Sequence, residues 1–389
     1  MIRRFWKMKI RKLLISLLLA SATLACSTAC NPASEGLLYS LSSDKTYYIL
    51  EDLGFCTDKD IVIPSTFNKL PVKKIDDWAF RNHDGFHSVT IPDSVTRIGA
   101  YVFSDSSLAS IKIPNSVTYI DAGAFYNCDK LTSIQIPNSV IGINGWTFYD
   151  CDSLTSIELP DSVTFISGAN AFYDCDNLTS VKFSNTITSI EDGTFANCDG
   201  LTSIVIPASV TYMGRNPFGG CSALKSIVVE KGNTTYHSAE NCIIETTSKT
   251  LIAGCNNSTI PADGSVTTIE EAAFSGCQDL TSLVIPEGVT SIRSYAFSSC
   301  TSLTSMVIPN GVISLEAFTF GECSGLTSIV IPESVRFIAG RTFYLCPNLT
   351  SITFQGTKAQ WEKIWKESFW DSDIGIYTVH CTDGDIQKE

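Results

Sequence analysis

Charged residues are scarce in this sequence: Asp, Glu, Lys and Arg make up 17% of its 389 residues, against roughly 25% in ordinary soluble proteins. Basic residues are the rarer kind, with 27 Lys and Arg against 40 Asp and Glu and a net charge of −13. This balance excludes a nucleic-acid partner, because phosphate binding needs a basic patch. It disfavours anionic membrane surfaces for the same reason. Apolar residues reach 44%, so the chain is expected to fold rather than to be disordered.

Motifs for catalysis and for metal binding are also missing. The sequence contains no H-E-x-x-H, G-x-S-x-G or G-x-x-x-x-G-K-[ST] segment, and no carboxylate pair stands out as an acid and base. Its four histidines are His83, His87, His237 and His380. Only His83 and His87 are neighbours, and no third ligand accompanies them. We therefore expect no enzyme, no cofactor and no metal site.

Long hydrophobic runs are limited to one, Leu13–Ala25, which follows six basic residues. Thirteen residues are too short to span a membrane and fit the core of a signal peptide. Cys30 follows Thr28-Ala29 and resembles a bacterial lipidation site, with Cys26 as the alternative; simple cleavage after Ala25 or Ala29 remains open. Translation starts at Met1 or Met8. The segment predicts export, with the mature chain lipid-anchored at the cell surface or secreted.

A repeat of 23 residues accounts for most of the remaining sequence. Each unit reads L-x-x-I-x-I-P-x-x-V-x-x-I, with Phe at position +17 and Cys at +20. The spacing is 24 once, between Leu154 and Leu178, and 56 after Leu224. The leading residues are Leu108, Leu131, Leu154, Leu178, Leu201, Leu224, Leu280, Leu303, Leu326 and Leu349.

The alternation in L-x-x-I-x-I predicts a half-buried strand, and the following Pro ends it because proline cannot donate a ladder hydrogen bond. The rest of each unit, up to the Phe and Cys, suits short turns or one-turn helices. A single unit buries too few side chains to fold, so the units must stack and share one continuous core.

This unit resembles the BspA-like, Treponema pallidum-type leucine-rich repeat family, over about residues 37–384. The resemblance implies a leucine-rich-repeat solenoid, an α/β-type repeat with a parallel β-sheet on one face and short turns or helices on the other. It also implies a bacterial surface or secreted protein that binds host or microbial proteins, and no catalytic residue set comes with the family.

The repeat boundaries suggest four regions. Residues 1–30 are the signal segment and residues 31–60 an N-terminal cap containing a hairpin at 37–51. Residues 61–355 form the solenoid, interrupted at about 231–259 by a hairpin. This hairpin could add to a binding surface, or it could be an elaboration typical of such repeats that has no partner. Residues 356–389 form a C-terminal cap, in which Trp361, Ile364 and Trp365 share one helix face.

The cysteines at +20 recur at Cys128, Cys151, Cys175, Cys198, Cys221, Cys277, Cys300, Cys323 and Cys346. We read them as a buried ladder of inert thiols, because parallel side chains do not pair readily and a spacing of 23 fits no zinc motif. Acidic or amide residues flank several of them, at Asn127/Asp129, Asp150/Asp152, Asp174/Asp176 and Asn197/Asp199. A calcium ladder is the alternative to ordinary turn chemistry there.

The outward position between the two inward Ile residues changes along the array. It is polar in the first half, at Thr90, Lys112, Gln135, Glu158 and Lys182, and apolar in the second, at Val205, Val228, Val284, Val307 and Val330. Contiguous exposed apolar surface often marks an interaction site; the plain alternative is the β-propensity of valine. We predict non-catalytic protein binding or adhesion through these valines, to a host matrix or microbial surface protein.

Two other functions remain open. Tyr126, Tyr149, Tyr173 and Tyr344 each follow a Phe of the repeat and could present parallel rings to a carbohydrate polymer. A structural scaffold of the cell envelope, without a host partner, is the third possibility.

Overall fold

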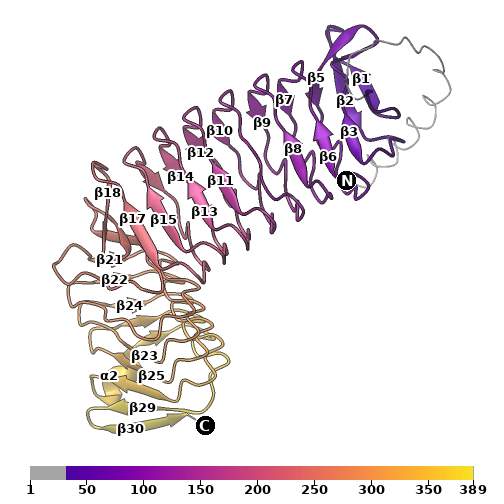
Figure 1. Ribbon diagram of the computed structural model, residues 1–389. Helices are drawn as coiled ribbons and strands as arrows, with labels where there is room; N and C mark the ends of the chain where they lie inside the picture. Colours follow the sequence, from indigo (N-terminus) through magenta and orange to yellow (C-terminus); the bar gives the residue numbers. More distant parts are fainter. Residues whose placement is uncertain (1–31, 389) are drawn as a thin grey trace. The chain divides into compact units, whose positions relative to one another are not determined.

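The L-x-x-I-x-I segments form a parallel ladder, called here the first ladder, in a computed structural model that describes residues 32–388 (Figure 1). Neighbouring repeats pair in register, as in Ser203↔Ser226 and Ile204↔Ile227. Its strands are β3 (Asp60–Val62), β6 (Ser88–Thr90), β8 (Ser110–Lys112), β11 (Ser156–Glu158), β13 (Ser180–Lys182), β15 (Ser203–Ile206), β17 (Ser226–Val229), β23 (Ser305–Val307), β25 (Ser328–Ile331), β27 (Ser351–Phe354) and β29 (Tyr377–Cys381). The predicted leucine-rich-repeat solenoid is confirmed.

The V-x-x-I segments form a second parallel ladder, where the sequence predicted only turns or short helices. Its members are mostly two residues long, too short for alternation to reveal them in the sequence. They are β5 (Leu70–Ile75), β7 (Arg97–Ile98), β9 (Tyr119–Ile120), β10 (Gly142–Ile143), β12 (Phe165–Ile166), β14 (Ser189–Ile190), β16 (Tyr212–Met213), β21 (Thr268–Ile269), β22 (Ser291–Ile292), β24 (Ser314–Leu315), β26 (Phe337–Ile338) and β28 (Trp365–Lys366).

Tight turns rather than helices carry the chain from the second ladder back to the first. The residue two positions before each Phe has positive φ, as at Trp78 (62°), Tyr101 (52°) and Trp146 (57°). The turns also stack through the backbone: the Phe125 amide donates to the Thr147 carbonyl at 2.9 Å, and the next repeats continue the pattern. Hydrogen bonds between the turns of neighbouring repeats thus satisfy backbone groups that a helix would otherwise satisfy within one repeat. Of the two predicted alternatives, the short turns are confirmed, and the repeats within residues 32–388 contain no one-turn helices.

The core consists of the inward Leu, Ile, Val and Phe side chains of all repeats. The Phe rings at +17 are buried and stack on one another, for instance Phe125 on Phe148 at 5.4 Å between centroids and Phe148 on Phe172 at 5.1 Å. Stacked aromatic rings add to the stabilisation that burial alone provides. The core forms two clusters, one on each side of the insertion. Within each cluster, neighbouring repeats share buried side chains, which allows repeats that are unstable alone to fold together.

The insertion contains three antiparallel strands: β18 (Tyr236–Ala239), β19 (Cys242–Glu245) and β20 (Thr250–Ala253). Strand β20 also pairs in parallel with β21 and so joins the second ladder. Ile243 and Ile252 are buried among the preceding repeats, whereas Ile244 and Leu251 are buried among the following ones. The insertion is thus an internal layer of the solenoid. A contribution of this insertion to a binding surface stays a prediction.

Both ends of the solenoid are covered. At the N-terminal end β1 (Leu38–Leu41) and β2 (Tyr48–Asp52) form a hairpin, and β2 pairs in parallel with β5. A second short hairpin joins β4 (Thr66–Phe67) to β5. At the other end β30 (Gly384–Lys388) pairs antiparallel with β29. Backbone groups that would otherwise be open edges are therefore paired.

The C-terminal cap contains the predicted helix, but the helix ends before two of the three residues expected on its face, Ile364 and Trp365. The helix α2 (Lys358–Lys363) has a Thr357–Gln360 capping box and buries Trp361, and Ile364 is buried after it. Trp365 does not share that face: it begins β28, pairs with Phe337 and is 69% exposed. Its backbone extends the second ladder, so its side chain points outward. Within residues 32–388, no helix is long and apolar enough to cross a membrane.

Candidate functional site

The valines predicted as a binding surface, called here the Val row, lie on the outward face of the first ladder. Ile204 and Ile206 point into the core, while Val205 between them is 49% exposed. Val228 is 44%, Val284 77% and Val307 56% exposed, and Val330 is half-buried. The outward direction follows from strand alternation, in which successive side chains face opposite sides.

The structure divides the Val row into two groups. Val205 pairs with Val228, and Val307 pairs with Val330, so each pair is side by side. Val284 belongs with the second pair, because the Thr304 amide of the next repeat donates to the Thr281 carbonyl at 3.3 Å. The row is therefore two patches, of two and three valines.

The β18–β19 hairpin separates the two patches. The Val229 amide donates to Ser238 Oγ of this hairpin at 2.9 Å. On its far side the Thr259 amide donates to the Glu240 carbonyl at 3.1 Å. Thr259 is the outward residue of that repeat, and it is exposed.

Threonines and serines border the valines. The Thr327 hydroxyl donates to the Thr304 carbonyl at 3.0 Å, and Thr304 bonds Thr281 in the same way. These two threonine hydroxyls are therefore occupied by the backbone. The patch around Val284, Val307 and Val330 is thus a flat surface of small side chains, a shape suited to a protein partner rather than to an enclosed small molecule.

The outward face of the first half is polar, as predicted. Lys182 forms an exposed ion pair with Glu158 at 2.5 Å. The first ladder is interrupted here, because a single bridge joins Lys112 to Gln135 and no ladder pairing joins Gln135 to β11. Two shallow hollows, of about 650 and 940 Å³, lie along this stretch.

The tyrosines considered for carbohydrate binding lie against one another. Tyr126 stacks on Tyr149 at 4.7 Å and Tyr149 on Tyr173 at 4.9 Å, both nearly parallel. Tyr344 meets Phe318 edge-on and has the Arg341 guanidinium over its ring. Ring faces that already cover each other are not open to a sugar, so this geometry favours a packing role.

The ladder cysteines are all buried and unpaired. In eight of the nine, the thiol donates to the carbonyl of the Phe one repeat earlier, at 3.0–3.2 Å. Burial raises the pKa of Cys128 and of Cys300 to about 12. Since the thiolate is the nucleophile and the metal ligand, thiols held in the neutral form serve packing and hydrogen bonding.

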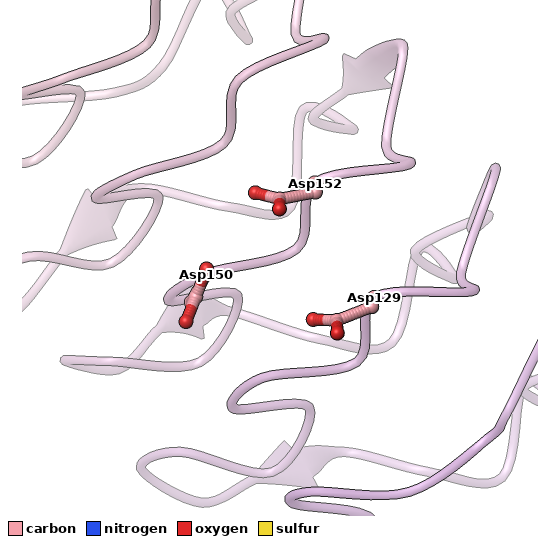
Figure 2. A group of neighbouring side chains, drawn as sticks. All are labelled: Asp129, Asp150 and Asp152. Carbon is pink, nitrogen blue, oxygen red and sulfur yellow. The ribbon is translucent and has the colours of Figure 1, made fainter.

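Three acidic residues from neighbouring repeats come together beside this ladder (Figure 2). Asp129, Asp150 and Asp152 each offer an oxygen, and the three atoms lie within 4.8 Å of one another. Partial burial, and then the charges of the neighbouring aspartates, raise the pKa of Asp150 to about 6. Ca²⁺ takes six to eight oxygen ligands, whereas the three aspartates bring one oxygen each to the shared position. We assign no metal function to them.

The histidines offer no joint site either. His237 Nδ1 lies 2.9 Å from Thr246 Oγ1, and His380 Nδ1 lies 3.0 Å from a carboxylate oxygen of Asp385. His83 and His87 lie in the loop before β6. Among residues 32–388, the three aspartates are the one group placed to share a metal ion.

Two exposed residues, each directly before a strand of the second ladder (β10 and β24), were not singled out in the sequence interpretation. Ile141 is 55% and Ile313 63% exposed at a position that is Thr in most repeats. Comparing that one position across repeats would have revealed them. They lie far apart in the repeat order, so they form no common patch.

Comparison with known proteins gives the family. The model of the BspA type leucine rich repeat region matches six copies, at residues 55–169, 146–263 and 245–374. The chain belongs to this family. No curated protein matches this chain.

Three solved structures are similar to this chain. A leucine rich cell surface protein from Faecalibacterium prausnitzii is 30% identical, with a TM-score of 0.71 over 88% of this chain and all of the other. The leucine rich repeat protein of T. pallidum is 30% identical over 50% of this chain and 90% of its own, with a TM-score of 0.45. The pneumococcal vaccine antigen PcpA is 18% identical over 88% of this chain and 97% of its own, with a TM-score of 0.60, and shows the fold alone.

Proposed function

We propose that this protein is exported and displayed at a bacterial cell surface, where it binds another protein without catalysis through the Val row. The lipid anchor would be attached to Cys30, or to Cys26; both lie outside the described residues. The observation that carries the proposal is the exposure of Val284 and Val307, 77% and 56%, on a regular sheet face. Its support is the general tendency of exposed apolar patches to be interaction sites, together with the cell-surface relative.

The test is a binding screen of the purified protein against immobilised matrix proteins, bacterial surface extracts and a glycan array at physiological salt. The informative variant is Val228→Lys with Val284→Lys and Val307→Lys. Saturable binding to a protein should be lost in this variant, because three charges would then be buried at the interface. Thermal unfolding should be nearly unchanged, since these side chains are outside the core.

A matched control places three lysines on the other ladder, at the exposed Thr118, Thr164 and Thr188. It should bind as the unmodified protein does. Binding to glycans alone would overturn the proposal in favour of carbohydrate recognition. Absence of any binding by the folded protein would favour the envelope-scaffold alternative.

A further inference from the structure

Carboxylates border the larger patch of the Val row on both edges of the sheet. Glu287 and Glu333 each stand three residues after a valine of the patch, at the edge where the strands end. Asp279 stands at the opposite edge, five residues before Val284. All three side chains are exposed. We call Asp279, Glu287 and Glu333 the carboxylate border.

No cation neutralises this border within the part of the chain that the structure describes. Glu287 Oε2 accepts hydrogen bonds from the Asn310 amide at 3.2 Å and its side chain at 3.4 Å, which hold the carboxylate at the sheet edge. The nearby Arg336 guanidinium donates to the backbone carbonyls of Glu333 and Val335 rather than to a carboxylate. The border thus presents negative charge beside an apolar surface.

Carboxylates elsewhere on the solenoid are often paired. Glu158 is bonded to Lys182 on the polar half of the same face, Glu270 to Arg293 and Asp121 to Arg97. The smaller patch, Val205 and Val228, has Lys225 and Lys231 close in sequence. Glu230, an exposed carboxylate with no ion pair, also stands beside the smaller patch. The patch of Val284, Val307 and Val330 differs from it in having no Lys or Arg within five residues of any of its valines.

The overall charge argues against a second copy of this chain as the occupant. Six of the 27 Lys and Arg residues lie before residue 13 and none of the 40 acidic residues does. The rest of the chain therefore carries 21 basic and 40 acidic residues. Two such surfaces placed face to face would oppose carboxylate to carboxylate, and like charges at an interface suppress the wrong partner.

We propose that the patch of Val284, Val307 and Val330 binds a protein segment whose apolar face is flanked by Lys or Arg. This rests on the proposed function and specifies its partner. The valines would cover the aliphatic side chains, while Asp279 on one edge and Glu287 and Glu333 on the other would pair with the basic flanks. Charge complementarity of this kind sets partner choice and association rate.

Two synthetic peptides test the proposal directly. Both are 14-residue amphipathic helices with a Leu stripe and a fluorescein label; one has Lys on both flanks of the stripe and the other has Glu. Anisotropy titrations on the full chain, at 50 and 300 mM NaCl, should show saturable binding of the Lys-flanked peptide. Binding should weaken at the higher salt, and the Glu-flanked peptide should bind at least tenfold more weakly.

The decisive variant neutralises the border: Asp279→Asn, Glu287→Gln and Glu333→Gln. It should weaken binding of the Lys-flanked peptide about tenfold and reduce the salt dependence. The matched control, Glu35→Gln with Glu51→Gln and Glu362→Gln, changes net charge equally at exposed residues outside repeats 203–333 and should change affinity less than twofold. Equal weakening in both variants would mean diffuse charge attraction and would overturn the proposal.

Two further outcomes separate this inference from the proposed function. If the triple Val→Lys variant loses a protein partner that the neutralised variant still binds fully, the Val row is the interface and the basic partner is wrong. If neither variant affects binding, both proposals fail. If sedimentation shows a dimer that the Val→Lys variant dissociates, the occupant is a second copy and the proposal is overturned.

Discussion

Each ladder cysteine sits where a small side chain and a hydrogen-bond donor are needed together. Cys323, for example, is fully buried, and its thiol reaches the Phe297 carbonyl at 3.0 Å. An alanine would leave that carbonyl without the thiol and open a small cavity. This pairing gives a packing reason for the repeated cysteine that requires neither a disulfide nor a metal.

Asp150, one of the aspartates beside the cysteine ladder, lowers the stability of the folded protein when its carboxylate is ionised. Because the pKa of Asp150 is raised, the folded state holds its proton more tightly than the unfolded chain does. Its contribution is therefore fully present below the unfolded pKa of about 3.9 and is lost as pH rises through about 6. Above pH 6 the ionised carboxylate opposes folding.

Replacing Asp150 by Asn should therefore stabilise the protein at neutral pH. Asn tolerates the positive φ of 56° at this position, and Asn127 and Asn197 already stand at equivalent positions. We expect a gain of up to about 1 kcal/mol at pH 7.5, modest because the side chain is only partly buried, and none at pH 4. Urea unfolding at the two pH values measures it.

Asp58→Asn, at an exposed position away from this group, serves as the control and should leave stability unchanged at both pH values. A loss of stability in Asp150→Asn at pH 7.5 would contradict the inference that the ionised Asp150 carboxylate opposes folding. It would mean that the carboxylate has a favourable partner, such as a bound cation.

At the scale of the element, the insertion is the part whose role the structure changes most. Strands β19 and β20 stand between two groups of repeats, and alternation sends successive side chains to opposite sides. Ile243 is fully buried in the preceding group and Ile244 in the following one. The insertion therefore joins two cores through its two faces.

Two adjacent substitutions should consequently loosen different halves of the solenoid. Ile243→Ala and Ile244→Ala should each cost about 2–4 kcal/mol, the usual loss for a large buried side chain. In hydrogen exchange, Ile243→Ala should raise exchange in the repeats before residue 236. Ile244→Ala should raise it after residue 260. Identical exchange patterns in the two variants would refute the two-sided packing.

The whole molecule depends on its ends, because each repeat is stabilised only by its neighbours. The C-terminal cap covers Ile352 and Phe354 with Trp361, Tyr377 and Val379, all buried. Ending the chain at Gln355 should expose these residues and the backbone edge of β27. We expect a lower unfolding temperature and concentration-dependent association, measured by calorimetry and light scattering. A truncated chain that melts like the full one and stays monomeric would show the cap to be dispensable.

Much of the fold could be predicted because the same pattern of apolar residues recurs in every repeat. The inward Leu, Ile and Phe positions and the outward positions of Val205 and Val307 follow from alternation within a single strand. The second ladder could not be predicted from the sequence, because strands of two residues such as β14 are too short to show an alternation of apolar and polar side chains. The outward position of Trp365 did not follow either, since helix spacing placed it on the face of Trp361.

The sequence by itself determined the repeat, its inward and outward residues and the acidic balance, because these depend on local alternation and on composition. Only the tertiary structure decided that the insertion is an internal layer. It also divided the Val row into two patches and left Asp279, Glu287 and Glu333 unpaired around one of them. These features depend on which segments stack between which repeats and on where long side chains find partners, and both are contacts between residues far apart in the chain.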